Sequence, residues 1–96
     1  MRKEIKISNT NKDIEEVCQE VAQLLIEKNA SYGDSALNPI RVFSRADSVE
    51  GLKVRIDDKL SRLAQGNYHT HKDTEDTELD LLGYLVLLRI ARKRRS

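Results

Sequence analysis

Apolar residues recur at helical spacing near the start of the chain. The first such stripe consists of Ile14, Val17, Cys18, Val21 and Leu25. These positions are three or four residues apart, which predicts an amphipathic helix with one apolar side. Thr10 or Asn11 can cap a helix that begins near Asp13. We expect this helix to end near Ser31, because Gly33 permits the left-handed backbone that terminates helices.

Two more stretches follow the same period. The second stripe consists of Val49, Leu52, Ile56, Leu60 and Leu63. Asp47 or Ser48 can cap this helix, which is expected to end before Gly66. The last predicted helix runs from Glu75 to about Arg92, and its apolar residues cover almost its whole circumference.

The spaces between the predicted helices contain no strand pattern and no repeat. Residues 32–47 are predicted to form a loop with a short turn around residues 41–44. The sequence therefore predicts one all-α domain with a core over about residues 12–92 and a basic tail over residues 92–96. A chain of 96 residues has too few other helices to cover the last one, so we expect a helical bundle completed by oligomerisation, as a homodimer or a homotetramer.

Composition narrows the class of protein. Charged residues make up 34% of the chain and aromatic residues 4%, which is typical of helix-rich water-soluble domains. Cys18 is the only cysteine and has no intramolecular partner, so a reducing cytoplasm is the expected compartment. No apolar run approaches the roughly 18 residues of a membrane-spanning helix, and no membrane association is expected.

The formal net charge of +1 conceals an acidic body and a basic end. Five of the 17 Lys and Arg residues lie in the last eight positions, which contain no acid. An acidic body makes nucleic-acid binding over a broad basic face an unfavourable interpretation. Residues 92–95 either contact phosphates or complement the negative end of a helix dipole.

The last predicted helix places carboxylates on its apolar side. At about 100° per residue, Asp76 and Asp80 fall on the same side as Gly83, Leu87 and Ala91. We therefore expect both aspartates to face inward. An ionised carboxylate is buried only when a cation accompanies it. The cation is either a metal ion or an Arg or Lys side chain from another helix.

The second predicted helix carries a polar ladder away from its apolar stripe. Arg55, Asp58 and Arg62 are spaced three and four residues apart, as in an ion-pair ladder exposed to solvent. The alternative is the polar wall of a cleft. In that case Asp58 helps to hold a cation, and Arg55, Lys59 or Arg62 binds phosphate.

The first predicted helix carries Glu16, Glu20 and Glu27 on one side, away from its apolar centre. A solvated face explains these glutamates if the helix is exposed. If the helix borders a cleft between subunits, a row of acids there binds Mg²⁺ instead.

Three segments together suggest a family. They are KNASYGDS at residues 28–35, VRIDDKLSRL at residues 54–63 and EDTELDLLGY at residues 75–84. In order and spacing they resemble the small phage-borne proteins grouped as a nucleotide-modification-associated helical domain. Those proteins look like compact relatives of the MazG-type all-α nucleoside triphosphate pyrophosphohydrolases. The resemblance covers about residues 14–92.

The resemblance implies an activity and its surroundings. It implies an oligomeric four-helix-type fold that binds Mg²⁺, for which Mn²⁺ can substitute, and hydrolyses a nucleoside triphosphate to the monophosphate and pyrophosphate. The substrate is a nucleoside triphosphate with either ribose or deoxyribose, and deoxyribose is the favoured alternative. Such an enzyme acts on the phage nucleotide pool or in modified-base metabolism, in the cytoplasm of the host. The alternative function is a non-catalytic helical phage protein that binds DNA or a replication partner through its basic tail.

The resemblance also implies site residues. The MazG pattern is a Glu-Glu-x-x-Glu helix followed by a Glu-x-x-Asp helix, whereas this chain has Asp-x-x-x-Asp in its last helix. The first motif maps either onto Glu16 and Glu20 or onto Asp57 and Asp58. The implied catalytic residues are Asp58 and Asp80; the metal ligands are Glu16, Glu20, Asp58, Glu75, Asp76 and Asp80; the substrate-binding residues are Lys28, Asn29, Tyr32, Lys59 and Arg62.

Overall fold

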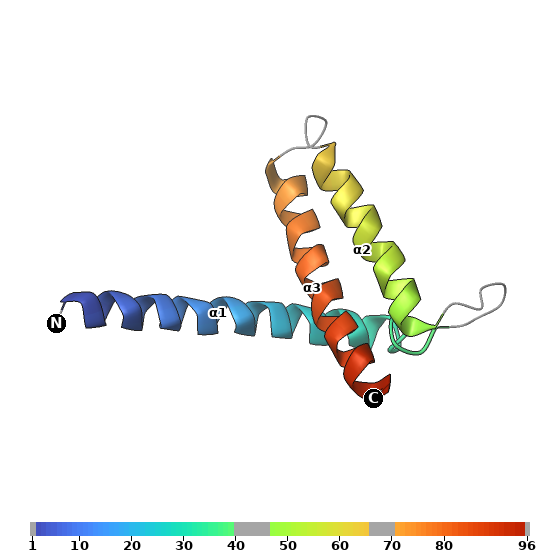
Figure 1. Ribbon diagram of the computed structural model, residues 1–96, viewed down its shortest axis with the longest axis horizontal. Coiled ribbons are helices and arrows are strands. Elements are labelled where there is room, and N and C mark those ends of the chain that lie inside the picture. The colour runs from blue at the N-terminus through green and yellow to red at the C-terminus, as the bar shows by residue number, and fades with distance from the viewer. Residues whose placement is uncertain (1, 40–46, 66–70, 96) are drawn as a thin grey trace.

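A computed structural model describes residues 2–39, 47–65 and 71–95, and these residues form three helices (Figure 1). The helices are α1 (Arg2–Ser31), α2 (Ser48–Ala64) and α3 (His71–Arg95). The all-α prediction is confirmed. The short turn predicted around residues 41–44 lies outside the described residues.

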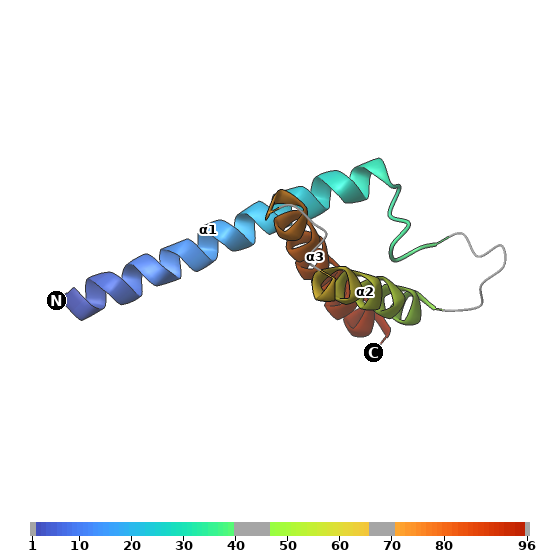
Figure 2. The ribbon, with the colours of Figure 1, turned by 90° about the horizontal axis from the view of Figure 1, so that it is seen from above.

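Helices α2 and α3 lie side by side and form a helical hairpin (Figures 1 and 2). As predicted, Asp47 caps α2: its Oδ1 accepts a hydrogen bond of 2.9 Å from the backbone N–H of Glu50. Val49 and Leu52 are buried against Ala91 of α3 and form the core of the hairpin. This capping and packing place the polar side of α2 next to the middle of α3.

Helix α1 is longer than predicted. It begins at Arg2 rather than near Asp13, so Thr10 and Asn11 lie inside the helix instead of capping it. Neither glycine nor proline occurs before Gly33, and nothing in residues 2–12 therefore interrupts the helix. The predicted end is confirmed: α1 stops at Ser31, and Gly33 has a positive φ of 61°.

The first half of α1 extends away from the hairpin (Figures 1 and 2). The radius of gyration is 16.4 Å, against about 13 Å for a compact domain of 100 residues. Val21 on the hairpin side is 6% exposed, whereas Ile14 and Val17 on the projecting part are 55% and 50% exposed. The predicted apolar stripe of α1 is therefore covered only towards its end.

Helix α3 begins at His71 and ends at Arg95, so it extends beyond the predicted limits of Glu75 and Arg92 at both ends. Its inner side packs on α2 and on the end of α1. In the described part of the chain, none of the helices has an apolar stretch long enough to span a bilayer.

Candidate functional site

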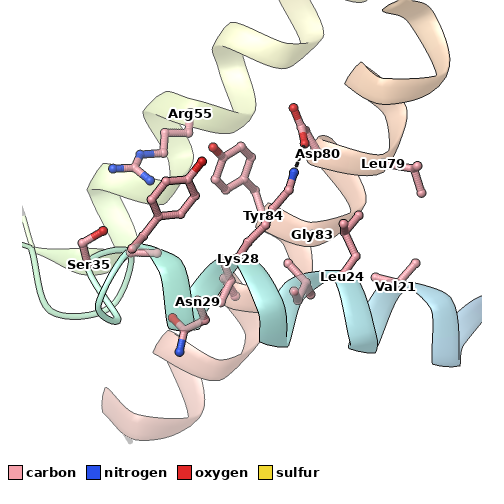
Figure 3. Close-up of a pocket in the computed structure, with 14 residues that line it drawn as sticks. Val21, Leu24, Lys28, Asn29, Ser35, Arg55, Leu79, Asp80, Gly83 and Tyr84 are labelled. Carbon is pink, nitrogen blue, oxygen red and sulfur yellow. Dashed lines mark hydrogen bonds and ion pairs between the residues drawn. The ribbon is translucent and has the colours of Figure 1, made fainter. Parts of the chain in front are cut away.

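One carboxylate connects the three helices. Lys28 lies in the last turn of α1. Its Nζ atom donates a hydrogen bond of 2.9 Å to Oδ1 of Asp80 on α3 (Figure 3). The other oxygen, Oδ2, lies 3.5 Å from the Nζ atom of Lys59 on α2. Each carboxylate oxygen therefore has an ammonium group from a different helix.

A glycine allows α1 to approach α3 at this point. Gly83 lies three residues after Asp80, on the same side of α3. A Cβ atom at Gly83 would lie only 2.7 Å from the Cδ2 atom of Leu25 on α1. Ordinary contacts between carbon atoms are about 3.5–4.0 Å. The missing side chain thus provides the space in which α1 crosses α3 and brings Lys28 to Asp80.

Tyr84 contacts Lys59 and adds a third cation, Arg55, at the same place. The guanidinium carbon of Arg55 lies 5.8 Å from the centre of the Tyr84 ring, and the Nζ atom of Lys59 lies 6.0 Å from it. These distances fall within the range of cation–π attraction. Tyr84 therefore helps to hold the two cationic side chains of α2 beside Asp80.

These residues surround a cavity of about 90 Å³ between the three helices (Figure 3). Its apolar lining comes from Val21, Leu24, Leu25, Ala36, Leu79, Gly83 and Leu87, and its polar lining from Lys28, Asn29, Tyr32, Ser35, Arg55, Asp80 and Tyr84. An apolar floor with a few convergent polar groups is typical of small-molecule sites, but those sites measure about 300–1,000 Å³. This cavity therefore has room for one part of a larger ligand, such as a phosphate group.

Cationic side chains outnumber carboxylates among the described residues at the cavity. Lys28 and Arg55 line the cavity and Lys59 adjoins it, while Asp80 is the one carboxylate that lines it among residues 2–39, 47–65 and 71–95. Burial raises the pKa of Asp80, but the hydrogen bond and charge of Lys28, together with Lys59, outweigh burial and bring that pKa below its ordinary value. The hydrogen bond to Asp80 raises the pKa of Lys28. Lys28 and Asp80 are therefore both charged at neutral pH.

Several residues predicted from the sequence meet at this cavity. Lys28, Asn29, Tyr32 and Asp80 line it, and Lys59 reaches Asp80. Of the two kinds of cation considered for Asp80, the structure shows Lys side chains from other helices.

Other predicted residues lie elsewhere. Glu16, Glu20, Asp58, Arg62, Glu75 and Asp76 are exposed and do not line the described cavity. The expectation that Asp76 faces inward is therefore wrong for this chain, because the end of α1 covers α3 near Gly83 and not at the start of α3.

The predicted Mg²⁺ site depends on which oxygen donors the fold brings close together. Mg²⁺ requires about six oxygen ligands, including carboxylates. In the described part of the chain, no three His, Cys, Asp or Glu side chains lie close enough together to hold one metal ion. Both oxygens of Asp80 already contact ammonium groups. The described residues of a single chain therefore do not form a donor set that fits the ion.

Tyr84 is a cavity residue that was not singled out from the sequence, and Arg55 was named there only as one of three alternatives for binding phosphate. Tyr84 lies four residues after Asp80, and Arg55 lies four residues before Lys59. Residues at this spacing are neighbours on one face of a helix. The spacing was a usable signal, but it points to a site only when the partner across the cavity is known.

The sequence matches no protein-family model and no curated protein, and the fold matches no solved structure.

Proposed function

We propose that this protein binds a deoxynucleoside triphosphate across the cavity between its three helices, with part of the ligand inside it, and hydrolyses it to the monophosphate and pyrophosphate. The observation that carries the proposal is the convergence of three separate segments on one cavity. Residues 28–35, 54–63 and 75–84, on which the family resemblance rests, each contribute to its lining.

The cavity suits the parts of such a ligand. Cationic side chains bind phosphate through charge-assisted hydrogen bonds, and Lys28, Lys59 and Arg55 supply three cations from two helices. Tyr32 and Asn29 lie at the end of α1, where a base or a sugar would extend from the phosphates. Asp80 is the carboxylate available to orient or deprotonate the attacking water.

The requirement for Mg²⁺ or Mn²⁺ is part of the proposal and rests on the resemblance alone. The proposed setting is the cytoplasm of a phage-infected cell, with deoxynucleotides for modified-base DNA as the substrate pool.

The proposed assembly is a homodimer or a homotetramer. Apolar side chains remain exposed on the projecting part of α1 and on α3; they include Ile14, Val17, Leu82 and Leu85. Exposed apolar side chains that gather into a patch mark association sites. Light scattering at micromolar concentration should report a dimer or larger, and a stable monomer would contradict this part of the proposal.

The activity is tested with a panel of nucleoside triphosphates, each with Mg²⁺ and with Mn²⁺, and with chromatographic separation of the products. We expect the monophosphate and pyrophosphate from at least one deoxynucleoside triphosphate. Lys59→Gln should lower kcat/KM by about ten- to a hundredfold, the loss expected for one charge-assisted phosphate contact. The matched control is Lys53→Gln on the same helix, because Lys53 pairs with Glu50 outside the cavity.

The observation that favours the alternative function is the cationic end of α3. Arg92, Lys93, Arg94 and Arg95 occupy its last turn and are exposed. A protein that acts through this tail should bind nucleic acid in a salt-sensitive way, and deletion of residues 92–96 should abolish binding. This result, together with no hydrolysis of any nucleotide, would replace the proposed enzyme by a binding module.

A further inference from the structure

Asp80 occupies the position where two lysines would bind a phosphate. Its two oxygens face two ammonium groups at 2.9 and 3.5 Å, as two oxygens of one phosphate group would. Lys28, Lys59 and Asp80 come from three different helices, so the fold, and not local sequence, creates the arrangement.

We propose that Asp80 is a built-in occupant of the phosphate position, which neutralises Lys28 and Lys59 until an incoming polyphosphate displaces it. This inference rests on the proposed function, since it assigns a regulating group to the same cavity. The ligand is a chain of two or more phosphates. The Asp80 carboxylate competes with this ligand for Lys28 and Lys59.

The ion pairs are suited to exchange. The side chains of Lys28 and Asp80 are 44% and 30% exposed. Ion pairs open to water contribute little to stability, because water solvates the separated groups well. Separation of Asp80 from Lys28 therefore requires little free energy, and an incoming anion can reach that pair. The Lys59 side chain is 15% exposed, so its 3.5 Å pair with Asp80 is the more buried of the two.

Charge decides which anions displace the carboxylate. A triphosphate carries several negative charges, whereas Asp80 carries one, and Arg55 on the same cavity adds a third cation. A monophosphate has a smaller advantage over the carboxylate. Return of Asp80 to the lysines would therefore favour release of a monophosphate product and discriminate against single phosphate groups.

The test is calorimetric titration with inorganic triphosphate, without metal ions, of the wild-type protein and Asp80→Asn. Removal of the competing charge should lower the Kd for triphosphate by about tenfold or more. The matched control is Glu78→Gln, which removes one carboxylate from the exposed side of the same helix. Its Kd should stay within about twofold of the wild-type value, because exposed charges at a distance are screened by salt.

Equal or weaker binding by Asp80→Asn relative to Glu78→Gln would overturn the inference, and so would absence of triphosphate binding by all three proteins. If Asp80→Asn does not fold, the wild-type protein provides the test. Saturation with triphosphate should then shift the carbon-13 resonance of the Asp80 carboxylate but not that of Glu78. An unchanged Asp80 resonance would equally overturn the inference.

The two proposals fail in different ways. Triphosphate binding that tightens in Asp80→Asn, without hydrolysis of any nucleotide by the wild-type protein, would remove the proposed enzymatic function and leave the internal competitor in place. Hydrolysis by the wild-type protein, with no change in triphosphate binding in Asp80→Asn, would do the reverse.

Discussion

Replacement of Gly83 by alanine tests the crossing of α1 and α3 that forms the cavity. The new Cβ atom would lie 2.7 Å from Leu25 Cδ2, about 1 Å inside an ordinary carbon–carbon contact. Either the Leu25 side chain rotates or α1 moves outward. Forcing an extra methyl group into a packed contact costs about 1–3 kcal/mol, while alanine is favoured over glycine within a helix by about 1 kcal/mol. We expect Gly83→Ala to lower the free energy of unfolding by about 0–2 kcal/mol.

Gly51→Ala is the matched control. Gly51 lies in α2, and a Cβ atom there would have no heavy atom within 4 Å. This substitution should stabilise the protein by about 0.5–1 kcal/mol through helix propensity alone. Urea unfolding at one fixed protein concentration should therefore separate the two alanine variants by about 1–3 kcal/mol. Equal stabilisation by both substitutions would refute the close approach of α1 at Gly83.

A double-mutant cycle locates the cause of the effect. Leu25→Ala removes the side chain that the new methyl group would meet. In the Gly83→Ala background this truncation should cost less than in the wild-type protein, with a coupling energy of about 0.5–3 kcal/mol. Additive effects would show that strain at Gly83 arises elsewhere.

Three further predictions concern stability. The folded-state pKa of Asp80 lies below its ordinary 3.8 and that of Lys28 above its ordinary 10.5, so the stability difference between wild type and Asp80→Asn should be constant near neutrality. Urea unfolding at a series of pH values measures this difference. It should shrink at low pH, below about 4, as Asp80 becomes protonated, and at high pH, as Lys28 loses its proton. Leu52 is 1% exposed, so Leu52→Ala should cost about 2–5 kcal/mol. Leu60 on the same helix is 50% exposed, so Leu60→Ala should cost far less in thermal unfolding of matched samples. Asp47→Ala removes the cap of α2 and should cost about 0.5–2 kcal/mol, measured by chemical denaturation, with Asp47→Asn largely retaining stability.

The sequence predicted the elements whose signals are local. The cap at Asp47 and the helix end before Gly33 depend on residues within one turn of each other, and the structure has both. The start of α1 was not predicted correctly. Thr10 and Asn11 can cap a helix only where the chain enters it, and the residues before them are already helical.

The site was predicted in part for the same reason. Helical projection placed Asp80 on the inner side of its helix. Projection gives the direction of a side chain, but it does not show which turns of the helix a partner helix covers. Asp76 shares that direction and is nevertheless exposed. The pairing of Lys28 with Asp80 spans 52 positions of sequence and depends on the crossing at Gly83, which no local pattern specifies.

Lysine footprinting tests most directly whether the three-helix cavity binds the triphosphate. The acetylation rate of each lysine is measured by mass spectrometry with and without a non-hydrolysable deoxynucleoside triphosphate. At a ligand concentration of about ten times Kd, Lys28 and Lys59 should react about tenfold more slowly, while Lys53 and Lys72 should react at unchanged rates. Protection of Lys93 in the basic tail, with Lys28 and Lys59 unaffected, would contradict the account.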